Sequence, residues 1–232
     1  MRRAMLLAAG AVAVVVAIGA ALFAFRGGDD EADLADDRAE QLRSAAADAG
    51  LDAEVADVLA LAARGATATF QVSYPGTDGT SLVVSQEPPN RRVDVLQAGL
   101  LVQSQVVRDG VSYRCQLPSR GRPGDELECT RTGGAIESPG AFTEEALTTF
   151  TEELAASLDA LDLTVEARTI ADTPASCLVT APKAGTRLDP EGPGVDTICL
   201  SHEGAQLLVD RGGERVVADD YSTTVPDGTF DV

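Results

Sequence analysis

Hydrophobic and polar residues alternate most regularly in the segment ATATFQVSY, which ends at Tyr74. Its apolar side carries Ala68, Phe70, Val72 and Tyr74, and its other side carries threonine, glutamine and serine. A period of two residues predicts a β-strand with one buried face. Short apolar runs recur after brief breaks in TSLVVSQ, RRVDVLQ, LLVQSQVV, VSYRCQL and ELECTR. About six consecutive strands with hairpin-length connections are typical of an antiparallel meander.

Two other segments repeat their apolar residues every three or four positions, which predicts helices. In LDAEVADVLALAARG, Asp52 is placed to begin the helix and Gly65 to end it. In segment 142–161 one face carries Leu147, Phe150, Leu154, Leu158 and Leu161. Strand-like runs then return in LTVEARTI, SCLVTA, TICLS, QLLVD and ERVVADDY. The order of elements predicts an α+β fold with an antiparallel sheet.

The N-terminus is apolar and uncharged from Ala4 to Phe25, after Arg2 and Arg3. This run is longer than the apolar core of the usual cleavable signal and long enough to span a bilayer. The two arginines favour a cytoplasmic N-terminus. We therefore expect residues 1–27 to form an uncleaved signal anchor, a transmembrane helix, followed by an acidic stalk or exposed helix at 28–50. The alternative is cleavage after a small residue such as Ala20 or Ala24.

The formal net charge is −19, and the only charged residues before the end of the apolar run are basic. The exported part is therefore more acidic still. Such a surface repels nucleic acid and anionic lipid headgroups, so we expect no nucleic-acid partner. The acidic run at 28–50 lacks the spacing of a calcium-binding loop and is interpreted as solvated charge.

The four cysteines fall in the arms of two predicted hairpins, Cys115 with Cys129 and Cys177 with Cys199. Four cysteines allow three connectivities, and pairing within each hairpin brings the residues closest. No two cysteines have the Cys-x-x-Cys spacing of a zinc ribbon or a thioredoxin-type centre. We predict two structural disulfides, no metal site and an extracytoplasmic domain.

Candidate catalytic residues are few. His202 is the only histidine and lies in a glycine-containing turn between Ser201 and Glu203. Catalysis would need a nucleophile and an orienting acid around it, and neighbours in a turn point apart. No hydrolase, phosphate-binding or dinucleotide-binding motif is present. We therefore expect a protein that is not an enzyme and needs no cofactor. Arg91 and Arg92 alternate along a strand, so they are expected on opposite faces, one solvated and one paired with an acid.

Three groups of residues together carry a resemblance to a known family. A proline-containing stretch holds Pro88, Pro89, Arg91 and Arg92; a hairpin holds Asp109, Gly110 and Tyr113; and the C-terminus holds Val225, Pro226, Asp227 and Phe230. In this order, over roughly residues 52–232, the chain resembles lipoprotein carriers of the LolA/LolB/LppX type. The resemblance implies a half-barrel domain at 51–232, in which a curved antiparallel sheet, an incomplete β-barrel, packs helices on its concave side.

Two functions fit this resemblance. The first is a domain tethered to the cell membrane by a single span, which binds a lipid or an acylated ligand. Its ligand face would comprise Phe70, Val72, Tyr74, Val84, Val93, Val95, Val111 and Tyr113. The second is a sensor or interaction ectodomain whose concavity is filled by the helix at 142–161 and whose acidic surface binds a protein partner. The expected anchor, the predicted disulfides and the lack of tryptophan distinguish the chain from the free carriers.

Overall fold

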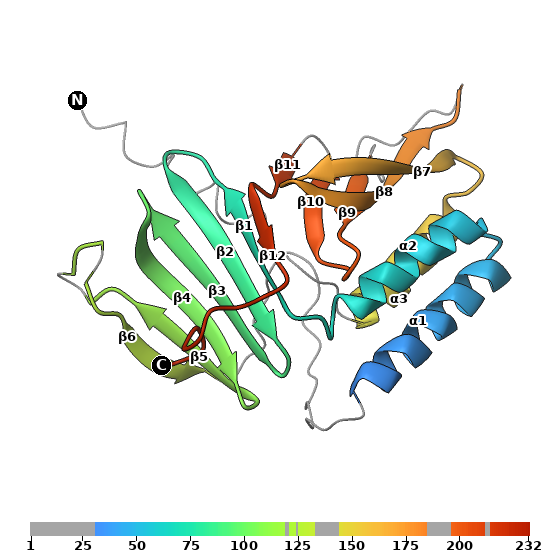
Figure 1. Ribbon diagram of the computed structural model, residues 1–232. Helices are drawn as coiled ribbons and strands as arrows, with labels where there is room; N and C mark the ends of the chain where they lie inside the picture. The colour runs from blue at the N-terminus through green and yellow to red at the C-terminus, as the bar shows by residue number, and fades with distance from the viewer. Residues whose placement is uncertain (1–30, 119–120, 124, 133–143, 185–195, 212–213) are drawn as a thin grey trace.

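The computed structural model describes residues 31–118, 121–123, 125–132, 144–184, 196–211 and 214–232 (Figure 1). The predicted signal anchor at 1–27 lies outside these ranges. None of the described helices is long and apolar enough to cross a membrane.

The larger sheet has seven antiparallel strands, in the order β12-β1-β2-β3-β4-β5-β6. Its strands are β1 (Phe70–Pro75), β2 (Thr80–Glu87), β3 (Asn90–Gln97), β4 (Leu100–Arg108), β5 (Val111–Gln116), β6 (Glu128–Thr132) and β12 (Asp220–Ser222). The first six follow one another as the alternation in the sequence predicts, so the meander is confirmed. The C-terminal strand β12 then adds to the outer side of β1.

The smaller sheet has five antiparallel strands, in the order β11-β10-β9-β8-β7. Its strands are β7 (Leu161–Ile170), β8 (Thr173–Pro182), β9 (Thr197–Leu200), β10 (Gln206–Arg211) and β11 (Glu214–Val217). The run ERVVADDY, predicted as one strand, is divided between the sheets. The Ala218 amide donates to the Leu207 carbonyl, and the next amide, of Asp219, donates to the Ser73 carbonyl in the larger sheet. This short crossing links the two sheets.

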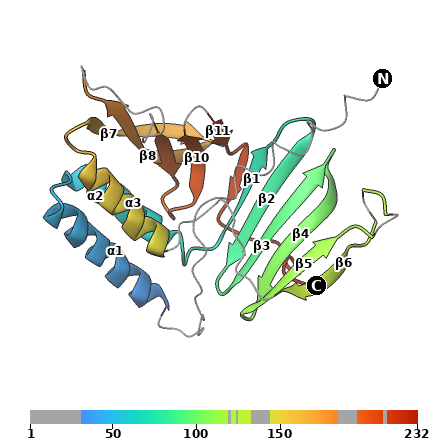
Figure 2. The same cartoon turned by 180° about the vertical axis from the view of Figure 1, so that it is seen from behind.

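Three described helices, α1 (Glu31–Asp48), α2 (Ala53–Arg64) and α3 (Glu144–Ala156), lie on the side of the smaller sheet that faces away from the larger one (Figures 1 and 2). Leu59 of α2 and Leu147 and Leu154 of α3 share a buried cluster with Leu178 and Leu200 of the smaller sheet. The segment predicted as an acidic stalk or exposed helix is helical in α1. One side of α1 is nevertheless buried, because Ala39 and Ala46 pack in the same cluster.

A second core lies between the sheets. Phe70, Val72 and Val84 of the larger sheet are fully buried, in a cluster with Cys177 and Leu207 of the smaller sheet. The smaller sheet is therefore a middle layer, since its strands alternate between residues that face the helices and residues that face the larger sheet. This arrangement explains why β8 and β9 each bury consecutive residues, which point to opposite faces of the sheet.

The predicted α+β class and the antiparallel, open character of the sheets are confirmed. Two details of the prediction are wrong. The strands form two sheets, and the described helices pack on the smaller sheet, whereas a concave side of the larger one was expected. The helix expected at 142–161 ends at Ala156, and Leu161 is the first residue of β7. A turn at 157–160 separates them, and its Leu161 amide donates to the Ser157 carbonyl.

Candidate functional site at the junction of the two sheets

The first six residues of the predicted ligand face lie together. Strand register pairs Val72 with Val84, Val84 with Val93, and Leu82 with both Tyr74 and Val95, which places all of them on one face. Five of the six are buried, and these are Phe70, Val72, Tyr74, Val84 and Val93. They contact side chains of the smaller sheet, so this face is filled by protein. Lipid binding by these residues stays a prediction.

Val111 and Tyr113 lie on the opposite face of the larger sheet. Tyr113 pairs with Val106 and Val106 pairs with Arg92, whereas Val93 on the filled face pairs with Gln105. The C-terminal segment is bound to this opposite face at two points. The Arg92 guanidinium donates 2.7 Å to the Thr229 carbonyl, and the Arg108 guanidinium lies 3.0 Å from the Asp231 carboxylate. The structure thus separates the eight predicted residues into two groups.

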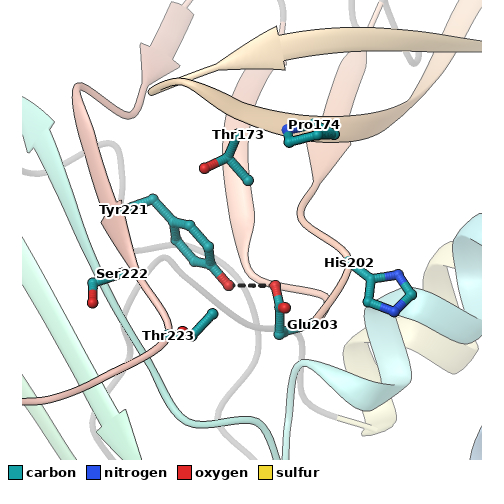
Figure 3. Close-up of a pocket in the computed structure, with 7 residues that line it drawn as sticks. All are labelled: Thr173, Pro174, His202, Glu203, Tyr221, Ser222 and Thr223. Carbon is teal, nitrogen blue, oxygen red and sulfur yellow. Dashed lines mark hydrogen bonds between the residues drawn. The ribbon is translucent and has the colours of Figure 1, made fainter.

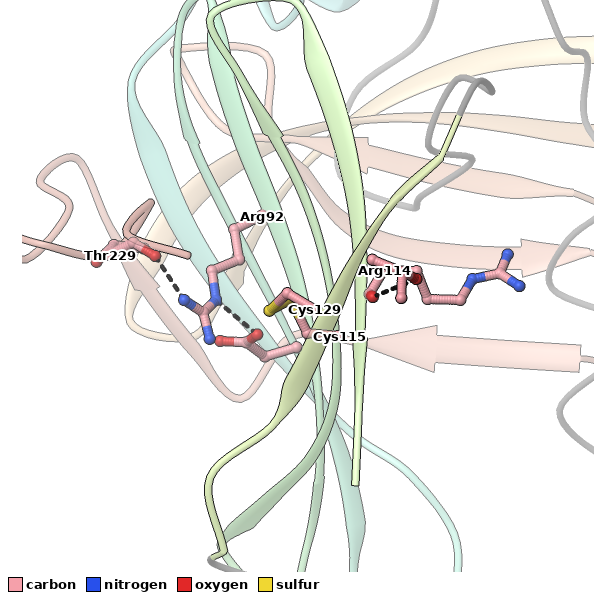
Figure 4. The surroundings of a disulfide bond; sticks show 7 residues. Arg92, Arg114, Cys115, Cys129 and Thr229 are labelled. Atoms are coloured by element: carbon pink, nitrogen blue, oxygen red, sulfur yellow. Dashed lines mark hydrogen bonds and ion pairs between the residues drawn. A yellow bond between two sulfur atoms is a disulfide. The ribbon is translucent and has the colours of Figure 1, made fainter. Parts of the chain in front are cut away.

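Arg91 and Arg92 are on opposite faces, as predicted. Arg92 forms an ion pair of 2.7 Å with Asp94, which confirms the expected pairing with an acid (Figure 4). The expectation that the other arginine is solvated is wrong, because Arg91 faces the core side near Tyr74. Burial lowers the pKa of Arg91 to about 10, against a smaller opposing effect of the Tyr74 hydroxyl.

Both predicted disulfides are present, Cys115–Cys129 and Cys177–Cys199. Each joins residues that are directly opposite in neighbouring antiparallel strands. The first lies at the β5–β6 end of the larger sheet, with Cys129 exposed to solvent (Figure 4). The second is fully buried between the sheets. Two disulfides indicate an oxidising, extracytoplasmic location.

A pocket of about 410 Å³ opens where the two sheets meet (Figure 3). Three segments form it: the start of β8, the β9–β10 turn and β12 with the residue after it. The lining residues are Thr173, Pro174, His202, Glu203, Tyr221, Ser222 and Thr223. The pocket therefore has walls from both sheets, and no residue that lines it belongs to the predicted ligand face.

A hydrogen-bond network fixes the polar wall of this pocket. The Tyr221 hydroxyl donates 2.6 Å to Oε2 of Glu203, and the Ser201 hydroxyl donates 3.1 Å to the Tyr221 oxygen. The amides of Glu203 and Ala205 each donate 3.2 Å to the Ser201 oxygen. Ser201 is fully buried, so the network joins the β9–β10 turn to β12 through an oxygen that water does not reach.

The network shifts the pKa of two side chains. Burial raises the pKa of Glu203, but hydrogen bonds from Tyr221, from its own backbone and from Ser201, with the charge of His202, outweigh burial and lower it overall. Burial and the hydrogen bond to Glu203 together raise the pKa of Tyr221 above its ordinary value. Glu203 is therefore a carboxylate at neutral pH, held by a neutral tyrosine.

The turn that carries Glu203 is set by a close approach to helix α2. Gly204 has φ +85°, and a Cβ placed on it would overlap the Leu61 carbonyl oxygen and the Gly65 amide. Only glycine allows this approach with this backbone conformation. Gly65 itself ends α2, as predicted from the sequence. The C-terminal end of α2 therefore packs directly against the turn that carries Glu203.

The three polar residues of the turn do not form a catalytic arrangement. The Ser201 oxygen accepts two backbone amides and donates to Tyr221, so its hydrogen-bonding capacity is used. His202 is exposed, and Figure 3 shows its ring turned away from Tyr221. Sequence reasoning missed that Ser201 and Glu203 meet at Tyr221. Their spacing of two residues was the available signal that both side chains face one side of the turn. The partner that joins them, Tyr221, is distant in sequence and could not be identified. In the described residues, no three His, Cys, Asp or Glu side chains are placed to hold a metal ion.

No protein-family model and no curated protein matches the chain. Among solved structures, the chain is similar to one described as the crystal structure of MucB in complex with MucA(peri). The match has 17% sequence identity and a TM-score of 0.42, and it covers 74% of this chain and 56% of that chain. The matched part therefore spans little more than half of that protein's length. The resemblance to the lipoprotein-carrier family stays a prediction.

Proposed function

We propose that the protein is an extracytoplasmic interaction domain, without catalytic activity, that binds a protein partner carrying basic residues. The observation that carries this proposal is the filled inner face of the larger sheet. An acyl chain needs an apolar cavity, and the residues expected to line one are packed against the smaller sheet instead. The second function considered from the sequence, a domain with a filled core, therefore fits better than a lipid carrier.

Charge supports the choice of partner. The chain carries a formal net charge of −19, and Lys183 is its only lysine. A strongly acidic surface accelerates encounter with a basic partner and repels acidic ones. Anchoring by residues 1–27 is part of the proposal, and it would hold the domain next to the membrane, where a partner with its own membrane span would meet it.

Carbodiimide crosslinking suits this composition, since the reagent joins carboxylates to amines. The chain has 37 acidic residues and one lysine, so it forms few crosslinks within itself and needs a partner to supply amines. The full chain is crosslinked in its native membranes, and the products are identified by mass spectrometry. The partner found is then purified and titrated against the full chain at increasing salt.

We expect one specific partner, whose affinity falls steeply between low and physiological ionic strength, because exposed charges are screened beyond about 8–10 Å. Native mass spectrometry of the same preparation tests the lipid hypothesis. Absence of a specific partner overturns the proposal. A stoichiometric acyl lipid on a chain without a partner would in addition favour the membrane-tethered lipid-binding function.

A further inference from the structure

We propose that the pocket at the junction of the two sheets binds one cationic side chain, lysine or arginine, of a partner protein, with Glu203 as its counter-charge. This inference rests on the proposed function and names the part of the partner that the domain recognises. The pocket volume of about 410 Å³ admits one long side chain.

The charges around the pocket favour a cation. The segments 172–174, 202–204 and 219–223 contain Asp172, Glu203, Asp219 and Asp220, and they contain no lysine or arginine. His202 is the only basic residue among them. A phosphate or carboxylate ligand would meet this negative field without a compensating cation, so an anionic ligand is disfavoured.

A metal ion is a poorer candidate than an organic cation. Hard divalent ions take six or more oxygen ligands at fixed distances. Among the described residues, no group of three potential ligands is close enough together to hold one. The ammonium or guanidinium group of a side chain needs fewer contacts, and hydroxyls such as those of Thr173, Ser222 and Thr223 suffice as additional acceptors.

The carboxylate is already oriented for such a ligand. Tyr221 occupies Oε2 of Glu203 with one hydrogen bond of 2.6 Å. A carboxylate accepts about four hydrogen bonds, so acceptor positions remain for a cation. Tyr221 is held by the buried Ser201, and Glu203 is held by Tyr221, so little side-chain entropy is lost when the ligand binds. The half-buried Tyr221 ring adds an aromatic wall, a favourable surface for lysine or arginine.

The test uses the full chain in detergent micelles, labelled with 3-fluorotyrosine. The chain has three tyrosines, which give three ¹⁹F signals that single Tyr→Phe variants assign. The probe is the peptide acetyl-Gly-Ser-Arg-Ser-Gly-amide, compared with the same peptide containing citrulline, a neutral isostere of arginine. We expect the arginine peptide to shift the Tyr221 signal and to leave Tyr113, on the far face of the larger sheet, unchanged. The citrulline peptide should bind on the order of tenfold more weakly, because its ureido group keeps N–H donors but lacks the positive charge that strengthens a hydrogen bond to the Glu203 carboxylate.

Two variants test whether the preference for arginine over citrulline depends on Glu203. Glu203→Gln keeps the shape and an acceptor for Tyr221 but removes the charge, and it should abolish the preference for arginine over citrulline. Glu214→Gln removes one exposed charge from β11, outside the residues that line the pocket, and should retain the preference. Circular dichroism confirms that both variants are folded.

The pocket assignment is overturned if both variants lose the preference for arginine to the same extent. It is also overturned if the unaltered chain binds the two peptides equally. Two outcomes distinguish a failure of the pocket assignment from a failure of the proposed function. A crosslinked partner that binds Glu203→Gln as tightly as the unaltered chain overturns the pocket alone. Arginine-selective binding at Tyr221, in a protein for which no partner is found, overturns the proposed function and supports the pocket as a site for a smaller cationic ligand.

Discussion

The hydroxyl of Tyr74 on β1 donates a hydrogen bond to the backbone carbonyl of Gln206 on β10, inside the core that the two sheets share. Tyr74 is 3% exposed, and desolvation by this core raises its pKa above the ordinary value. The bond is a polar, directional contact inside a core between the sheets that is made largely of apolar side chains. It therefore helps to fix the position of the β9–β10 turn, and with it Glu203, relative to the larger sheet.

Tyr74→Phe should destabilise the protein by about 1–3 kcal/mol, because a buried hydrogen bond is lost without a change in packing volume. Urea unfolding of the full chain, followed by circular dichroism, measures the difference. Tyr113→Phe is the matched control, since the Tyr113 hydroxyl makes no hydrogen bond among the described residues and should change stability by less than about 0.5 kcal/mol. Equal effects of the two substitutions would contradict the role given to Tyr74.

Stability should fall in acid through Glu203. Its pKa is lowered in the folded protein, so the folded state favours the carboxylate more than the unfolded state does. The resulting stabilisation is present above the ordinary glutamate pKa of about 4.3 and is lost as the pH falls through the lower, folded value. Since Glu203 is partly exposed, the effect should remain below about 1 kcal/mol. Unfolding free energies of the unaltered chain and Glu203→Gln, measured from pH 6 down to about pH 3, should converge; parallel curves would refute the effect.

At high pH the unfolding free energy should fall as the pH rises, and the side chain responsible is Tyr221. Burial first, and then the hydrogen bond to Glu203, raise the pKa of Tyr221 in the folded protein. The stabilisation is complete below the ordinary tyrosine pKa of about 10 and is lost as the pH rises above it, because only the unfolded chain then releases the proton. In Tyr221→Phe the unfolding free energy should fall less steeply at alkaline pH. The decline that remains should come from Tyr74, whose pKa is also raised in the folded protein.

The sequence predicted the local elements well and their assembly poorly. Alternation from Ala68 to Tyr74 identified β1 and its buried face, because side-chain direction in a strand depends only on neighbouring residues. It could not identify what covers that face. The covering strands come from the second half of the chain, and an apolar face has the same pattern whether a ligand or a second sheet packs on it.

The candidate pocket was missed for a related reason. Its walls come from three segments that are distant in sequence, and Ser201, Glu203 and Tyr221 form a network only because the chain changes sheets at Asp219. The cysteine pairs were predictable, since each pair lies in one hairpin and hairpin pairing is local. Long-range contacts of this kind leave no periodic signal in a single sequence.

Gly204→Ala should be among the most damaging single substitutions in the protein. A left-handed backbone costs a residue with a Cβ about 1–2 kcal/mol. At Gly204 the Cβ would also overlap the carbonyl of Leu61 and the amide of Gly65, which are backbone atoms that cannot rotate away. Gly99→Ala is the matched control, because Gly99 has a similar φ of +77° with no atom within 4 Å of the added Cβ.

We expect Gly99→Ala to cost about 1–2 kcal/mol, and Gly204→Ala to cost at least about 2 kcal/mol more, since overpacking adds to the backbone strain. Chemical denaturation of both variants checks the difference. The ¹⁹F signal of Tyr221 should move in Gly204→Ala and stay in place in Gly99→Ala, since only the former displaces the turn that carries Glu203. Similar costs for the two substitutions would show that the turn does not rest on the end of α2.

The two disulfides should respond differently to reduction. Thiol–disulfide exchange requires access to a sulfur, and Cys129 is exposed, whereas Cys177 and Cys199 are fully buried. Mild dithiothreitol should therefore reduce Cys115–Cys129 first, with little effect on the core between the sheets. Alkylation with iodoacetamide followed by peptide mass spectrometry gives the order directly. Labelling of all four cysteines at one rate would mean that the smaller sheet opens as readily as the edge of the larger one.

By loop closure alone, with sequence separations of 14 and 22 residues, each bridge contributes about 3 kcal/mol. Removing Cys177–Cys199 by alanine substitution should cost more than removing Cys115–Cys129, because it also leaves a void in the core where Val72 and Leu207 pack.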